Sequence, residues 1–90
     1  MYVITSNTTT DSATGTAETI PEALTVFAGQ LRPLLLAGGV RWKITDPTGT
    51  DHEGNINLNG RHDLLHNAVS ELCDDLYPQL HRAADGYRGV

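Results

Sequence analysis

The alternation of apolar and polar side chains over residues 40–58 predicts a β-hairpin. Val40, Trp42 and Ile44 alternate with polar residues, and Ile56 and Leu58 repeat the same period of two after a turn-rich loop. Strict alternation of this kind is typical of strands that bury one face. Beyond the hairpin the apolar period lengthens to that of a helix. The stretch therefore predicts a small α+β domain in which helices pack on a sheet.

A first helix is predicted upstream of this hairpin. Thr19 and Glu22 form a capping-box pattern, and Pro21 lies in the first turn, where its missing N–H costs nothing. Pro33 interrupts the helix, and we expect a kink or a break near Arg32 because the proline ring would clash with the carbonyl four residues earlier. The Gly-Gly pair that follows ends the helix. The residues at helical spacing that should face the sheet are Ile20, Ala23, Leu24, Phe27, Leu31, Leu34 and Leu35.

A second helix is predicted after the hairpin. Asn59 is its expected N-cap. Pro78 is expected to kink or end this helix, with any continuation reaching Ala84 before Gly86. One apolar stripe runs along it, made of Leu65, Ala68, Val69, Leu72, Leu76 and Leu80.

The N-terminal part predicts one strand followed by a loop. Tyr2–Thr5 has strand character, whereas residues 7–18 are dominated by Thr, Ser, Ala and Gly. We expect an exposed, mobile loop there, although threonine also favours strands and residues 8–10 could extend the first strand. The predicted order is β-α-β-β-α over a single domain of residues 1–90. Its short three-stranded sheet, antiparallel or mixed, would carry both helices on one face.

The net charge of the chain limits the kind of partner that the protein is expected to bind. Six Lys and Arg residues against eleven Asp and Glu give a net charge of −5. Direct nucleic-acid binding would need a basic stripe, which six scattered residues do not supply. An acidic surface instead favours a partner protein with a basic surface. No apolar run approaches ~20 residues, so we expect no membrane span. The single cysteine allows no intramolecular disulfide, which is typical of a cytoplasmic protein.

His62 and His66 form the most suggestive metal-binding pattern. Histidines four residues apart share one face of a helix, and with Asp63 the string is similar to the His-Glu-x-x-His motif of zinc proteases. Aspartate is one methylene shorter than glutamate, and a catalytic zinc needs a third protein ligand. Cys73 would lie about 10.5 Å further along the axis at 1.5 Å per residue, which is too far. We therefore expect no metal and no cofactor, with the two histidines flanking the apolar stripe.

Two other groups of reactive side chains are explained more simply as structure. The loop at residues 46–54 holds three carboxylates, but their spacing does not match an EF-hand. Its first four residues, Asp46 to Gly49, instead favour a type I turn. Cys73 lies beside Asp74 and Asp75, whose field would raise the thiol pKa. A partly buried structural cysteine is the simpler interpretation.

The strand at Val40 should present two different faces. Trp42 is expected to pack under the helices, although on the open face it would become an interaction anchor. Arg41 and Lys43, with Asn55 and Asn57, should line the uncovered sheet face. That surface is polar and rich in asparagine, and it suits hydrogen-bonded contacts as well as plain solvation.

The outer side of the second helix is the predicted partner-binding surface. Glu71, Asp74 and Asp75 lie together there, with Leu64 at a neighbouring azimuth. An exposed leucine beside carboxylates suits a basic partner surface with an apolar centre, while solvation alone also places charge on the outer face of a helix.

The resulting hypothesis is a non-enzymatic, acidic protein-binding module. It would act as an inhibitor or regulator of the phage or mobile-element accessory type, by covering a basic surface of another protein. Two alternatives remain open. A homodimer could form through the helix stripe or a free sheet edge, and a metal-binding protein, including a metal-dependent enzyme, could use the histidine pair.

Overall fold

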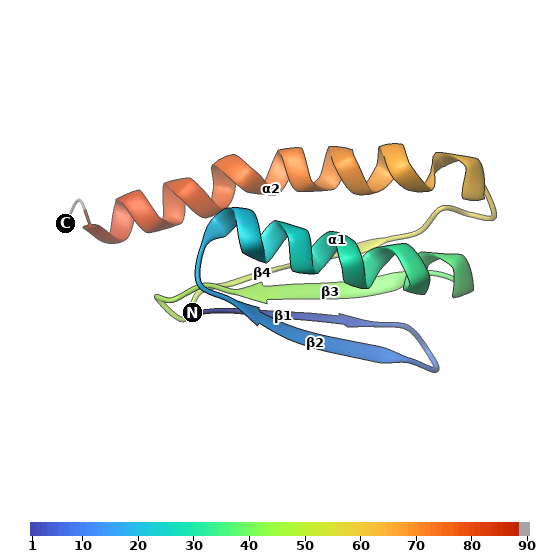
Figure 1. Cartoon of the computed structure of the whole chain (residues 1–90), viewed down its shortest axis with the longest axis horizontal. Coiled ribbons are helices and arrows are strands. Elements are labelled where there is room, and N and C mark those ends of the chain that lie inside the picture. The colour runs from blue at the N-terminus through green and yellow to red at the C-terminus, as the bar shows by residue number, and fades with distance from the viewer. Residues whose placement is uncertain (89–90) are drawn as a thin grey trace.

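The fold is a four-stranded antiparallel sheet with two helices on one side (Figure 1). A computed structural model describes residues 1–88 of the chain. The strands are adjacent in the order β2-β1-β3-β4. Along the chain the elements are β1 (Tyr2–Asn7), β2 (Ser12–Ala17), α1 (Ile20–Ala37), β3 (Val40–Thr45), β4 (Asp51–Ile56), the 3-10 turn η1 (His62–Leu64) and α2 (Leu65–Arg88).

The sheet has one strand more than the sequence predicted. Residues 12–17, expected to belong to a loop, form the edge strand β2, which pairs antiparallel with β1. The order is therefore β-β-α-β-β-α and not β-α-β-β-α. The residues of β2 that face the helices are Ala13, Gly15 and Ala17, which are more buried than their neighbours. Because these residues are small, the alternation that marks a strand is nearly invisible in the sequence.

Helix α1 begins as predicted and ends later than a break at Arg32 would allow. The hydroxyl oxygen of Thr19 accepts a hydrogen bond from the backbone N–H of Glu22 at 3.2 Å. The Glu22 carboxylate accepts a hydrogen bond from the backbone N–H of Glu18 at 3.4 Å. The helix then runs through Pro33 without interruption. Both Pro33 and Gly29 are exposed, so water can solvate the carbonyl that loses its helical partner.

Helix α2 differs from the prediction at both ends. Asn59 does not cap it, because Asn59 and Gly60 both have positive φ angles, 54° and 80°, and form a turn before η1. Helix α2 continues through Pro78 to Arg88, beyond the predicted limit at Ala84. Pro78 is exposed, so its interruption of the hydrogen-bond ladder faces solvent, as at the proline in α1.

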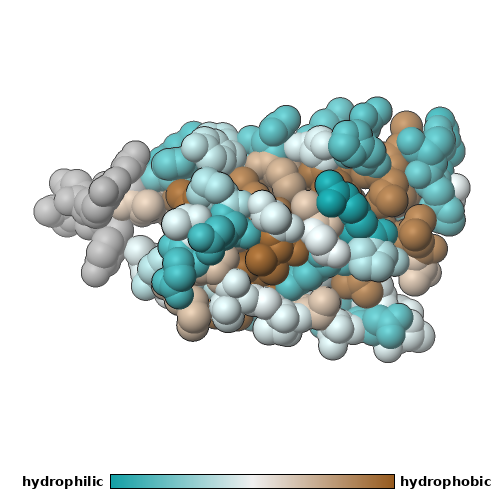
Figure 2. Space-filling view, in the orientation of Figure 1, coloured by the Kyte–Doolittle hydropathy of each residue, from teal (hydrophilic) through white to brown (hydrophobic). Residues whose placement is uncertain are grey.

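The hydrophobic core lies between the sheet and the helices, as the apolar stripes predicted. Trp42 is 6% exposed and makes an edge-to-face contact with Phe27, with ring centroids 5.2 Å apart. Trp42 is therefore a core residue and not an open-face anchor. Helix α2 packs chiefly against α1, and Figure 2 shows apolar surface where the helices meet. Buried residues of the stripes and β3 include Ile20, Ala23, Phe27, Leu31, Leu35, Val40, Ile44, Val69, Leu76 and Leu80.

A buried polar contact fixes α1 onto the central strand β1. The Gln30 side-chain amide donates to the carbonyl of Ile4 at 2.9 Å, and the Ser6 hydroxyl donates to the Gln30 side-chain oxygen at 2.7 Å. Ser6 is fully buried. Because a buried hydroxyl without a partner is costly, this contact specifies how α1 sits along β1.

None of the helices over residues 1–88 is long and apolar enough to cross a membrane.

Candidate functional site

The predicted partner-binding residues are all at the surface. Glu71, Asp74 and Asp75 lie on α2 and are exposed, while Leu64 is 38% exposed and belongs to η1. We call these four residues the acidic surface. Among the side chains of residues 1–84, none of its carboxylates takes part in an ion pair. Their charge is thus available to another molecule.

Sequence reasoning missed two exposed apolar side chains on the helices. Tyr77 is 46% exposed on α2, with its ring tilted against His81 at a centroid distance of 4.5 Å. Leu36 is 52% exposed in the last turn of α1. Both signals were present, because Tyr77 lies off the apolar stripe of α2 and Leu36 lies outside the set of α1 residues predicted to face the sheet.

Cys73 and Asp74 lie in a groove between α1 and α2. The groove has a volume of about 330 Å³, and Arg32 of α1 lines it as well. The thiol of Cys73 is half-buried and lies 3.9 Å from the Leu24 carbonyl oxygen. Burial raises the pKa of Cys73, the Asp74 carboxylate raises it further, and the Arg32 guanidinium opposes them. The pKa is raised in the predicted direction, but chiefly by burial, and of the two aspartates only Asp74 contributes; a raised pKa favours a protonated, unreactive thiol at neutral pH.

The histidine pair is not arranged as the sequence suggested. His62 lies in η1 and His66 in the first turn of α2. The two side chains therefore do not share one α-helical face, and both are exposed. In the described part of the chain, no three His, Cys, Asp or Glu side chains converge as a metal site would require. His52, a conceivable third ligand, is instead bound to Asp46.

Asp46 organises the β3–β4 turn through both oxygens of its carboxylate. One oxygen accepts the backbone N–H groups of Thr48 and Thr50, each at 3.0 Å. The other lies 2.9 Å from His52 Nε2. Burial raises the pKa of Asp46, but hydrogen bonds from Thr48, His52 and Thr50 together outweigh it and hold that pKa below its ordinary value. The carboxylate is thus ionised at neutral pH and serves the turn.

The open face of the sheet is polar, and its two cations have different neighbours. Lys43 is directly opposite Glu53 of β4. Arg41 lies between Asn7 of β1 and Asn55 of β4. As predicted, Arg41, Lys43 and Asn55 are exposed on the face away from the helices.

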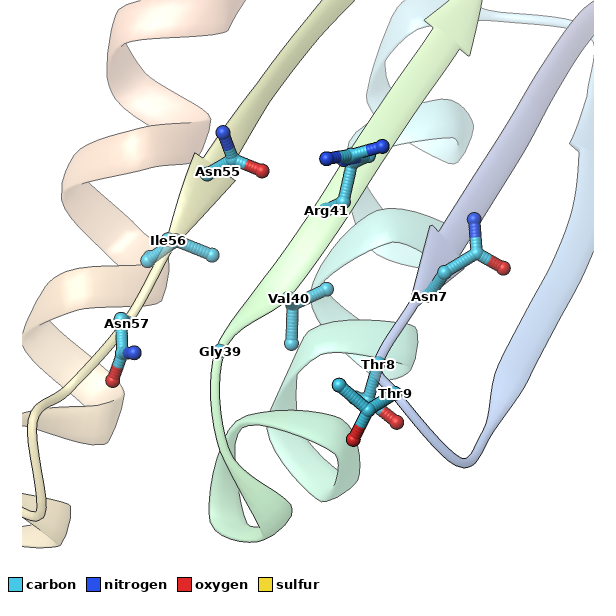
Figure 3. A pocket seen from close by; sticks show the side chains of 9 residues that line it. All are labelled: Asn7, Thr8, Thr9, Gly39, Val40, Arg41, Asn55, Ile56 and Asn57. Carbon is cyan, nitrogen blue, oxygen red and sulfur yellow. The ribbon is translucent and has the colours of Figure 1, made fainter.

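A hollow of about 390 Å³ lies at the end of the sheet beside Arg41. Its lining comes from the ends of β1 and β4 and the start of β3. Figure 3 shows the Arg41 guanidinium above the sheet between the side chains of Asn55 and Asn7, with Asn57 further along the chain. The pattern of asparagines signalled a polar face, but only the strand register brings Asn7 beside Arg41.

Comparison of the chain with models of protein families, with curated proteins and with solved structures gave no match.

Proposed function

We propose that this protein is a non-enzymatic binding module that covers a basic surface of a partner protein with the acidic surface, Leu64, Glu71, Asp74 and Asp75. It would act as an inhibitor or regulator of that partner, in the manner of small acidic accessory proteins of phages and mobile elements. The observation that carries the proposal is the exposure of these carboxylates and of Leu64, with no ion pair formed by the carboxylates among the described side chains.

The chemistry of the surface suits a partner with basic residues around an apolar centre. Leu64 and Tyr77 provide apolar contact area, and aromatic side chains are enriched at the centre of interfaces. The carboxylates would speed association and exclude acidic competitors. Because such charges are exposed, added salt should screen their attraction to the partner and weaken the complex.

The test compares two charge-reversed baits in a pull-down from source lysate. The first carries Glu71→Lys, Asp74→Lys and Asp75→Lys. The matched control carries Asp11→Lys, Glu18→Lys and Glu53→Lys, which changes net charge equally at exposed sites on other elements. We expect the wild type and the control to retain the same partner, and the α2 variant to lose it. Equal retention by both variants, or equal loss, would contradict a specific role of the acidic surface.

A second candidate function, a homodimeric structural subunit, is favoured by the composition of β2. This edge strand has six residues, Ser12–Ala17, with neither a charge nor a proline. Natural edge strands usually carry such features to prevent pairing with other strands. The opposite edge, β4, has Asp51 and Glu53. A two-fold axis beside β2 would continue the sheet into a second copy.

Light scattering across a range of protein concentrations tests this second candidate. The wild type should approach twice the monomer mass as concentration rises. A Thr14→Lys/Thr16→Lys variant should remain monomeric, because both residues are exposed on β2 and would place like charges across the new pairing. A wild type that stays monomeric throughout would exclude this candidate.

A further inference from the structure

Arg41 is a cation whose directly paired residues on both neighbouring strands are amides. Its two cross-strand neighbours are Asn7 and Asn55, whereas Lys43, two residues along the same strand, has Glu53 opposite. Among the described residues Arg41 makes no ion pair. Glu53 lies near enough to line a second hollow with Arg41, but it pairs across the strands with Lys43, so the residues directly beside Arg41 are both amides.

The amides around Arg41 have hydrogen-bonding capacity to spare. Among the side chains described, those of residues 1–84, the amides of Asn7 and Asn55 have no hydrogen-bond partner that meets ordinary geometry. The oxygen of Asn57 accepts the N–H of Asn59 at 2.8 Å, which leaves its NH₂ group free. That NH₂ lies against Gly39, where a Cβ atom would come within 3.0 Å of it. The absence of a side chain at Gly39 therefore makes room for the Asn57 amide in the hollow.

The donor set defines the chemistry of a ligand. A guanidinium presents a rigid fork that matches two oxygen atoms on one carbon or phosphorus, and each asparagine adds an NH₂ donor. The hollow has a volume of about 390 Å³, within the range of small-ligand pockets. We propose that this hollow binds the carboxylate or phosphate group of a small ligand, with Arg41 as the central contact and Asn7, Asn55 and Asn57 as flanking donors.

This proposal is independent of the acidic surface. Arg41 projects from the open face of the sheet, whereas α2 lies on the opposite side (Figures 1 and 3). An anion can therefore approach Arg41 without passing the carboxylates of α2. One surface can also be altered without altering the other.

The test is a titration of the ¹⁵N-labelled protein, followed by NMR, with sodium phosphate and separately with sodium acetate, at an ionic strength held constant with chloride. We expect saturable shifts of the Asn7, Asn55 and Asn57 side-chain amides and of backbone amides near residue 41. Saturation by phosphate alone, acetate alone or both would support the proposal and identify which oxyanion is preferred.

Two variants with the same change in charge make the test specific. Arg41→Gln should weaken binding roughly tenfold, the scale of losing a charge-assisted hydrogen bond. Lys43→Gln lies on the same strand and face but outside the hollow, and it should change affinity less than about twofold. Asn55→Asp should also weaken binding, because it gives Arg41 the carboxylate that Lys43 already has. Absence of saturable shifts with either anion, or equal weakening by Arg41→Gln and Lys43→Gln, would overturn the proposal.

Discussion

At the scale of single residues, Asp46 and Trp42 show how buried groups constrain this fold. The Asp46 carboxylate accepts hydrogen bonds from Thr48 and Thr50 of its own turn and from His52 of β4. The Trp42 ring fills the space above Gly54, where an added Cβ atom would lie 2.9 Å from the indole. Each contact is short-range, and each predicts a measurable response to substitution.

Acid should destabilise the protein through Asp46. Its pKa is lower in the folded than in the unfolded state, so its contribution to stability is complete above the unfolded value of about 3.9. That contribution is lost as the pH falls through the lower folded value. At pH 7, Asp46→Asn should reduce the free energy of unfolding by about 1–3 kcal/mol. The deficit should shrink below pH ~4.

Urea unfolding followed by circular dichroism from pH 7 to pH 2.5 measures this dependence. Asp63→Asn is the control, because Asp63 is exposed and pairs only with exposed Arg61 at 3.4 Å. It should change stability by less than about 0.5 kcal/mol. A deficit for Asp46→Asn that stays constant down to the lowest pH would contradict the linkage.

Adding one methyl group should have opposite effects at two glycines. Gly54→Ala would push a Cβ atom into the Trp42 ring, which also makes an edge-to-face contact with Phe27. We expect a loss of about 1–3 kcal/mol from this overpacking. Gly29→Ala meets nothing within 4 Å on the exposed side of α1. It should stabilise the protein by about 0.5–1 kcal/mol through helix propensity. Thermal unfolding compares both, and a neutral Gly54→Ala would show that Trp42 can move aside.

At the scale of elements, the two helices and the β3–β4 hairpin were predictable, whereas β2 was not. Their buried positions carry large apolar side chains, which give a clear period in the sequence. In β2 the same positions carry alanine and glycine, because α1 packs closely there. A Cβ atom at Gly15 would lie 2.7 Å from Val26. The need for small residues in β2 comes from the close packing of α1, so the sequence of β2 shows no strong alternation of apolar and polar residues.

Helix ends were predicted well only where the signal is local. The cap at Thr19 depends on residues within one turn and is confirmed. Pro33 and Pro78 were expected to kink their helices or to end them, and neither ends its helix, because both helices continue through them. Packing of the apolar stripes continues past each proline, and it offsets the lost hydrogen bond when the free carbonyl faces water.

The buried contact between α1 and β1 predicts energetic coupling between Ser6 and Gln30. Gln30→Leu would leave the Ser6 hydroxyl buried without its acceptor, and Ser6→Ala would leave the Gln30 oxygen without its donor. Each single substitution should cost about 1–3 kcal/mol. The double variant should cost less than the sum, with a coupling of about 0.5–3 kcal/mol. A urea-unfolding cycle measures this coupling, and additive losses would mean that the pair does not cooperate.

At the scale of the whole molecule, β1 and α2 differ in how firmly they are held. Strand β1 has a strand on each side and α1 above it. Helix α2 packs chiefly against α1 alone. Native-state hydrogen exchange should therefore be at least ~10-fold faster for the amides of α2 than for those of β1, because peripheral elements open without global unfolding. Equal protection of the two elements would show that α2 unfolds only with the core.

The candidate sites, like the elements of the fold, have a part that the sequence predicted and a part that only the structure shows. The acidic surface was identified from the sequence because helical spacing alone places Glu71, Asp74 and Asp75 outward, and all three are exposed. Leu64 was placed on the same helix and instead lies in η1. The hollow at Arg41 was predicted only in part. Asn55 and Asn57 belong to the same predicted hairpin as Arg41, so the sequence placed them near it. Asn7 belongs to a distant segment, and nothing in the sequence indicated that it lies beside Arg41.

The sequence by itself determined the class of fold, the two helix stripes, the burial of Trp42 and the charge on the outside of α2. Each of these follows from spacing within one element, which side-chain geometry converts directly into faces. The tertiary structure alone decided that residues 12–17 pair as an edge strand, that prolines sit within continuous helices, and that Asn7 lies beside Arg41. Those features depend on contacts between segments distant along the chain, where packing outweighs local preference.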